Sequence, residues 1–307
     1  MFRPSARIYS AFRRRRPAQI PRPDDLPRRI GPQLAFTGGV ATLAIGSAAY
    51  ATNKDTEERN KGYLLAWRRN HGTGLQRDLA RSRWEDVYER ARGWVGSFPG
   101  NRLVVILSES WLEMSEAKRT QAGLIALFGG VWLAWRLPQA SRFGQYLAHD
   151  PLSGRSATLL TSIFSHRTLP HLAFNSIALY SFGTACFAFL DYSEHLPRST
   201  SRYEFLAFFA TAGLASSFVS HVWFSRIVAG RLLQIASTPQ VRQAIVPSLG
   251  ASATAGLVVV DLIGLLRGWR MFDHAAHLSG AAMGALWWAY GHDWFERLRV
   301  ALLQRKH

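Results

Sequence analysis

Blocks of apolar residues about as long as a bilayer is thick recur along the chain. A helix needs about 20 such residues to cross a bilayer, or about 17 at the short end. The pattern therefore predicts an all-α fold, a polytopic membrane helical bundle with an extra N-terminal helix over 33–51 and a membrane core over 119–291. About six candidate spans are expected, at residues 34–51, 120–135, 171–190, 203–224, 247–266 and 274–290.

Polar segments separate these blocks. Residues 52–118 carry many charges and are predicted to form an extramembrane linker, whereas the mixed segment 139–170 is expected to be an interfacial loop. Pro170 directly precedes the apolar block 171–190, and proline is well tolerated in the first turn of a helix. Residues 292–307 are predicted to be a basic C-terminal tail.

The charge balance is strongly basic, with 37 Lys and Arg against 20 Asp and Glu, a formal net charge of +17. The excess lies at the N-terminus and in loops without any motif of a nucleic-acid-binding fold, so the expected partner is the lipid bilayer and not nucleic acid. Residues 1–32 are rich in arginine and have no acidic residue before Asp24. This composition is typical of a mitochondrial transit peptide, with a disordered basic segment as the alternative. The single Cys186 leaves no intrachain disulfide framework.

A serine and a histidine in the last two apolar blocks suggest nucleophilic chemistry. Ser252 stands between small residues, and a serine hydroxyl needs a base within hydrogen-bond reach. His277 is the candidate base, since imidazole titrates near the operating pH. It precedes Gly280 and Gly284, a pair that allows close helix crossing, and a crossing with segment 250–256 would bring imidazole and hydroxyl together. A packing contact is the alternative for each residue alone.

Other polar residues lie in predicted spans, where they are costly and therefore functional candidates. His171 and Asn175 are four positions apart, share a helix face and could both donate to an oxyanion; an interhelical polar contact is the alternative. Asp261 has no assigned role. His274 and His277 could suggest a metal, but the sequence has no HExxH motif, so neither a metal nor a cofactor is expected.

Taken together, these patches resemble the rhomboid family of intramembrane serine proteases, and more narrowly its mitochondrial branch, the presenilin-associated rhomboid-like proteases. The resemblance extends from about Ser115 to Tyr290, with an extra N-terminal span before the core. It is carried by Trp135-Arg136-Leu137-Pro138, by Phe164 to Gly183, by Pro247 to Ser252 and by Gly268 to Gly280.

The resemblance implies a role for each candidate residue. Ser252 would be the nucleophile and His277 the base of a dyad, while His171 and Asn175 would supply side-chain donors to the oxyanion hole. No acid completes a triad in this family, so Asp273 is not given that role. The implied reaction is hydrolysis of a peptide bond in or near the transmembrane segment of single-span membrane proteins. The implied location is the mitochondrial inner membrane, and no cofactor is implied.

The interval between the two dyad residues departs from the family pattern. Only 25 positions separate Ser252 from His277, whereas the family core places two helix passages there, each of about 20 residues. The sequence from Asp261 onward resembles the segment leading into the family's histidine helix, so a helix and a loop are missing after Ser252. Besides an active protease, the alternatives are a catalytically inactive membrane adaptor and a short isoform or gene model that lacks one core helix.

Overall fold

The structure is a computed structural model that describes residues 30–70, 106–107, 110–111, 113–151, 153–191, 198–231, 251–267 and 273–304. These residues form helices, turns and short connections, with no strand in the described part of the chain. The predicted all-α fold class is confirmed. The expected transit peptide falls outside the described residues except for its last three positions, which open the first helix, and most of the expected linker also falls outside them.

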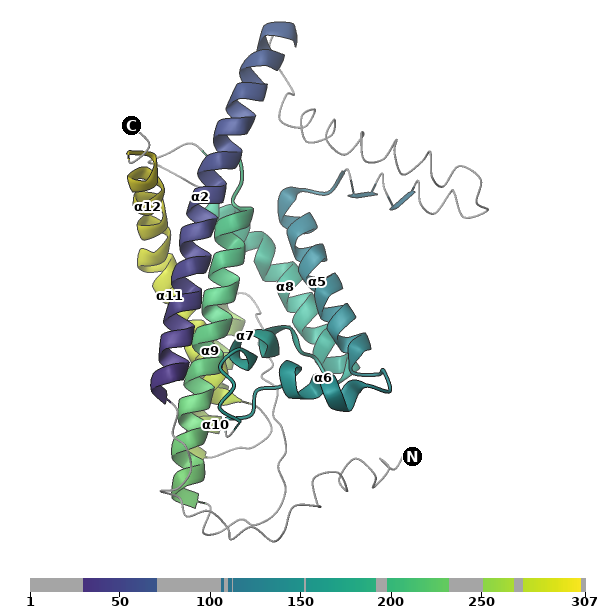
Figure 1. Cartoon of the computed structure of the whole chain (residues 1–307), viewed down its shortest axis with the longest axis vertical. Helices are drawn as coiled ribbons and strands as arrows, with labels where there is room; N and C mark the ends of the chain where they lie inside the picture. Colours follow the sequence, from purple (N-terminus) through teal and green to yellow (C-terminus); the bar gives the residue numbers. More distant parts are fainter. Residues whose placement is uncertain are drawn as a thin grey trace. The chain divides into compact units, whose positions relative to one another are not determined.

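The helices follow one another in chain order, as labelled in Figure 1. The longer ones are α2 (Ile30–Asn70), α5 (Glu116–Ala134), α8 (Leu169–Leu190), α9 (Arg202–Arg231), α10 (Ala251–Arg267), α11 (His274–Leu286) and α12 (His292–Gln304). Short helical segments complete the series: α6 (Ala140–Leu147), α7 (Thr158–Thr161), a 3-10 turn (Ser162–Phe164) and a π-helical turn (Trp287–Gly291).

Three described helices contain segments that are long and apolar enough to cross a membrane: Ile30–Arg59, Leu169–Leu190 and Arg202–Ser225. They coincide with three of the six candidate spans. Helices α5, α10 and α11 occupy the other three positions and are shorter, with 19, 17 and 13 residues. These helices are not among the described ones that combine the length and the apolarity needed for a crossing, so spans at these positions remain predictions.

The chain divides into two compact units. Unit 1 comprises Met1–Leu43, Ala126–Ala178 and Phe209–Trp287, and unit 2 comprises Ala44–Ile125, Leu179–Phe208 and Trp288–His307. Unit 1 contains all four residues of the expected catalytic set.

An aromatic cluster forms part of the interior of unit 1. The ring of Phe128 in α5 is almost fully buried. Its centroid lies 6.2 Å from the ring centroid of Phe164 and 6.2 Å from that of Phe209. The imidazole of His166 lies 4.7 Å from the same ring. Aromatic pairs at such separations add to the free energy gained by burial alone. The cluster thus anchors the loop before α8 against α5 and α9.

Two of the segments that carry the family resemblance touch each other. The indole N–H of Trp135 donates to the hydroxyl of Ser165 at 2.9 Å, and the guanidinium of Arg136 donates to the carbonyl oxygen of Arg167 at 3.0 Å. The guanidinium of Arg167 also lies 4.5 Å from the centre of the Trp135 ring, within cation–π range. The end of α5 therefore fixes the entry into α8, the helix that carries His171.

A histidine pair lies in the same unit, between α6 and α9. The Nδ1 of His149 is 2.8 Å from the Thr158 hydroxyl, and its Nε2 is 3.0 Å from Nδ1 of His221. Burial lowers the pKa of His149 to about 4, and the neighbouring His221 acts in the same direction. Folding therefore opposes protonation of this imidazole.

Acidification between pH 7 and pH 4 is expected to destabilise unit 1. The unfolded imidazole titrates near 6.5, so below that pH the unfolded state binds a proton that folded His149 takes up only near pH 4. The loss reaches roughly 2–3 kcal/mol. Thermal unfolding midpoints in detergent at stepped pH measure it, and His149→Gln should reduce the slope of the profile, leaving the part that comes from His166. An unchanged slope in that variant would contradict the assignment.

Helices α2, α9 and α12 meet in the core of unit 2. Ala48, Ala49, Ala207 and Phe295 are buried there, and partly buried side chains such as Tyr203 and Leu298 surround them. Alanines on α2 and α9 let the large ring of Phe295 enter between them, which is the close packing expected of small residues in membrane helices.

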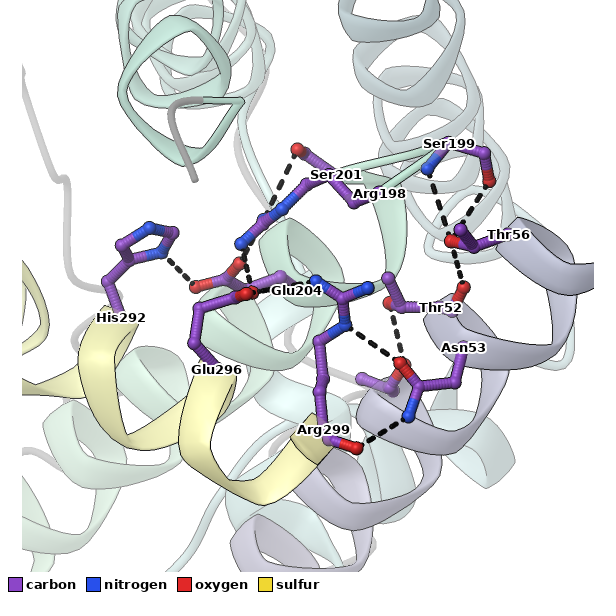
Figure 2. Close-up of polar contacts among 11 residues, drawn as sticks. Thr52, Asn53, Thr56, Arg198, Ser199, Ser201, Glu204, His292, Glu296 and Arg299 are labelled. Atoms are coloured by element: carbon purple, nitrogen blue, oxygen red, sulfur yellow. Dashed lines mark hydrogen bonds and ion pairs between the residues drawn. The ribbon is translucent and has the colours of Figure 1, made fainter. Parts of the chain in front are cut away.

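Buried charged and polar side chains of these three helices and of the segment before α9 contact one another, as Figure 2 shows. Arg198 contacts the carboxylates of Glu204, at 2.6 Å, and Glu296. Arg299 donates to Glu296 at 2.9 Å and to the side-chain oxygen of Asn53 at 3.0 Å. Two guanidinium groups thus face two carboxylates, so the formal charges balance, as buried ion pairs require.

The basic tail expected at 292–307 is therefore a packed helix over its described part, α12, in which Phe295, Glu296 and Arg299 are buried. Helix α2 likewise runs to Asn70, beyond the expected end at residue 51. Its polar residues there, Thr52 and Asn53, are buried in unit 2.

Candidate active site

The candidate site of unit 1 is built where α10 packs against α11. Asp261 lies within α10, and His274 and His277 lie in the first turn of α11. The Nδ1 of His274 is 2.6 Å from Oδ1 of Asp261, and the Nδ1 of His277 is 3.0 Å from Oδ1 and 3.1 Å from Oδ2. All three side chains are buried, with 3–7% of their surface exposed. One carboxylate thus lies between two imidazoles.

Asp273 is the N-cap of α11 and fixes where this helix begins, one residue before His274. The side chain of Asp273 accepts a hydrogen bond from the backbone N–H of Ala276 at 3.0 Å, the usual function of aspartate at an N-cap. Ser220 of α9 donates to the other oxygen of the same carboxylate. Asp273 therefore serves the backbone of α11 and not the imidazole of His277.

A glycine makes the approach of the two helices possible. Gly264 follows Asp261 by three positions and so lies on the same face of α10. A Cβ atom added at Gly264 would lie 2.3 Å from Nε2 of His274, which is closer than real Cβ contacts allow. The imidazole of His274 therefore rests against the bare backbone of α10.

The first glycine of the expected GxxxG crossing approaches α9, and the crossing with 250–256 stays a prediction. A Cβ atom at Gly280 would lie 2.9 Å from the hydroxyl of Ser216 in α9, whereas one at Gly284 would meet no heavy atom within 4 Å. Gly280 thus serves contact with α9. The partner segment expected for this crossing, 250–256, has no described side chains.

The predicted oxyanion donors lie on α8. His171 is 95% buried, and the centre of its ring is 4.9 Å from that of His166 in an edge-to-face arrangement. Burial lowers the pKa of His166 to about 4, and the neighbouring His171 acts in the same direction. Asn175, one turn later on α8, is half-buried. Their service as oxyanion donors remains a prediction.

Ser252 occupies the second position of α10, and its side chain is outside the described part of the structure. A straight α-helix separates Ser252 and Asp261, nine positions apart, by about 13.5 Å along its axis and places them on opposite faces. The described geometry brings His277 to Asp261. The pairing of Ser252 with His277 remains a prediction.

In the described part of the chain, one group of side chains could by residue type hold a metal ion: Asp261, His274 and His277. Two ligand atoms about 2.0–2.1 Å from a tetrahedral Zn²⁺ would lie roughly 3.3 Å apart. The 2.6 Å between His274 and Asp261 is shorter and matches a charge-assisted hydrogen bond. The group is therefore arranged as a hydrogen-bonded carboxylate.

Sequence reasoning left Asp261 without a role. The signal was present as two matched spacings, Asp261-x-x-Gly264 on α10 and His274-x-x-His277 on α11. Residues three apart share a helix face, so each spacing presents two groups toward one neighbour. What the sequence did not show is that these two faces meet.

Comparison with known proteins agrees with this fold. Residues 153–294 match the family model of the Rhomboid domain, so this helical membrane protein contains a rhomboid domain. The matched region includes both α10 and α11.

The similar proteins have names that contain both 'rhomboid' and 'mitochondrial'. The chain is 27% identical over 309 residues to Presenilin-associated rhomboid-like protein A, mitochondrial, of Danio rerio, covering 94% of this chain and 77% of that protein. It is 29% identical over 296 residues to the human Presenilin-associated rhomboid-like protein, mitochondrial, covering 89% and 70%. Rhomboid protein 1, mitochondrial, of Saccharomyces cerevisiae is 27% identical over 203 residues. No solved structure matches the chain significantly.

Proposed function

We propose that this chain is an intramembrane serine endopeptidase that cleaves single-span membrane proteins in or near their transmembrane segments. The observation that carries the proposal is the Rhomboid domain match over 153–294, which contains all four candidate residues. The names of the similar proteins favour a mitochondrial location. Within the mitochondrion we propose a multi-pass protein of the inner membrane, as the family resemblance implies.

In the proposed reaction, the hydroxyl oxygen of Ser252 attacks the scissile carbonyl carbon while His277 takes up the hydroxyl proton. His171, Asn175 and the backbone N–H of Ser252 stabilise the oxyanion. The C–N bond then breaks as His277 returns the proton to the leaving amine. Water, activated by the same imidazole, hydrolyses the acyl-enzyme and restores the serine.

A second candidate function is a catalytically silent membrane adaptor that binds transmembrane clients. Two observations favour it: the 25-position interval, and the straight-helix separation of Ser252 from Asp261, the residue that His277 contacts. If both residues keep these places, the serine hydroxyl stays out of reach of the imidazole, and an unactivated serine is a weak nucleophile.

Covalent labelling separates the two functions. The full chain in lipid vesicles should react with a fluorophosphonate probe and cleave a single-span reporter, and Ser252→Ala should abolish both. Ser47→Ala changes another serine of an apolar helix, whose hydroxyl only contacts the carbonyl of Ala44, and should leave both intact. Absence of labelling and cleavage in the unaltered chain, with retained capture of the reporter, would replace the protease by the adaptor.

A further inference from the structure

The contact between His277 and Asp261 has a chemical consequence that a two-residue dyad lacks. The nitrogen of His277 that faces the carboxylate is Nδ1, at 3.0 Å and 3.1 Å from its two oxygens. An ionised carboxylate only accepts hydrogen bonds, so the nitrogen that faces it must carry the proton. In the neutral ring, this leaves Nε2 as the basic nitrogen.

The carboxylate itself is held from a second side. His274 approaches the same oxygen, Oδ1, through its own Nδ1 at 2.6 Å, and its ring lies against Gly264. Asp261 and Gly264 belong to α10, and both histidines belong to α11. Rotation of the carboxylate about its side-chain bonds would therefore break contacts to two imidazoles at once.

Burial strengthens this arrangement. Asp261 is 7% exposed, and His274 and His277 are 3% and 7% exposed, so little water competes for these hydrogen bonds. Hydrogen bonds to a charged group are roughly twice as strong as neutral ones, and a dry environment increases the difference. The preference for one tautomer of His277 should accordingly be large.

We propose that Asp261 is the positioning residue of the base: it holds His277 in the tautomer protonated at Nδ1, so that Nε2 is unprotonated and can accept the proton of the nucleophile. This inference rests on the proposed function in naming the base. It assigns a role to a third residue that the expected Ser–His dyad does not include. His274 and Gly264 support the carboxylate and take no part in the proton transfer.

The test uses the full chain labelled with ¹⁵N-histidine in lipid vesicles, with the ring-nitrogen signals of His277 identified by their loss in His277→Gln. The unaltered protein should show a protonated Nδ1 and an unprotonated Nε2. In Asp261→Asn, the amide N–H donates to Nδ1, and the proton should move to Nε2. Cleavage should then fall roughly 10²- to 10⁴-fold in kcat, with KM changed less than about twofold.

Asp273→Asn is the matched control, because it makes the same change four residues before His277, and asparagine caps helices as well as aspartate. It should leave the His277 tautomer and kcat unchanged. An unaltered protein with the proton on Nε2, or an Asp261→Asn variant with unchanged ring signals or unchanged kcat, would overturn the proposal. If Asp261→Asn does not fold, the spectrum of the unaltered protein decides alone.

The two proposals can fail separately. A chain that cleaves nothing, but whose His277 tautomer switches in Asp261→Asn, would retain the positioning contact and lose the protease function. A chain that cleaves its reporter while Asp261→Asn leaves kcat intact would retain the protease and lose the role of Asp261.

Discussion

Replacing His277 with alanine is expected to slow cleavage of a single-span reporter roughly 10⁴- to 10⁶-fold. The imidazole is the proposed acceptor of the serine proton, and the described residues place its Nδ1 against Asp261, which leaves Nε2 for the reaction. Without it, only the oxyanion donors and substrate binding would remain to accelerate hydrolysis. Single-turnover cleavage in lipid vesicles measures the effect with the chemical step isolated.

His149→Gln provides the comparison for this variant. It alters another largely buried imidazole of unit 1, one that contacts Thr158 and His221, and cleavage at pH 7 should stay within about twofold. If the cleavage rate of His277→Ala stays within a hundredfold of that of the unaltered chain, His277 is not the base.

Replacing Glu296 with alanine should cost unit 2 about 3–5 kcal/mol of unfolding free energy. Glu296 faces the guanidinium groups of both Arg198 and Arg299, and the side chain of Arg299 is fully buried. Removal of the carboxylate leaves two buried positive charges opposite Glu204 alone. Denaturant titration in detergent micelles, followed by the intrinsic tryptophan fluorescence of the chain, measures the loss.

Glu58→Ala makes the same chemical change where the structure predicts little effect. Glu58 pairs with Lys54 at 3.9 Å, and both side chains are about 60% exposed. Exposed pairs contribute roughly 0–1 kcal/mol, so this variant should unfold almost as the unaltered chain does. Equal losses in the two glutamate variants would show that the buried charges do not stabilise unit 2.

Hydrophobic pattern was enough to locate the three described helices that are long and apolar enough to cross a membrane, because lipid contact selects apolar residues over a fixed length of chain. The pattern did not show which polar residues are buried by partners distant in the chain. The segment after Ala51 is expected to be an extramembrane linker, and in the structure its first residues, Thr52 and Asn53, continue α2 and are buried within unit 2. Charged residues such as Glu296 and Arg299 likewise make 292–307 look like a solvated tail in the sequence, although both side chains are buried in the structure.

The candidate site was predictable in part. Residue types and the family resemblance singled out Ser252, His277, His171 and Asn175, since a nucleophile, a base and oxyanion donors are recognisable singly. Asp261 was not assigned, because its function follows only from the packing of α10 on α11 and from a glycine that admits an imidazole. Contacts of this kind depend on which helix faces meet, and one sequence does not contain that information.

The pairing of Asn53 with Arg299 joins residues 246 positions apart, through hydrogen bonds from side chain to side chain and to the backbone. Helix α12 follows every other described helix in the chain, so Arg198 and Glu204 enter the nascent protein well before Glu296 and Arg299. The charge set shown in Figure 2 can therefore close only after the ribosome has passed Arg299. A chain released by the ribosome before Arg299 would lack these contacts and leave unit 2 with an incomplete interior. Such a chain should be less stable than one that contains Arg299.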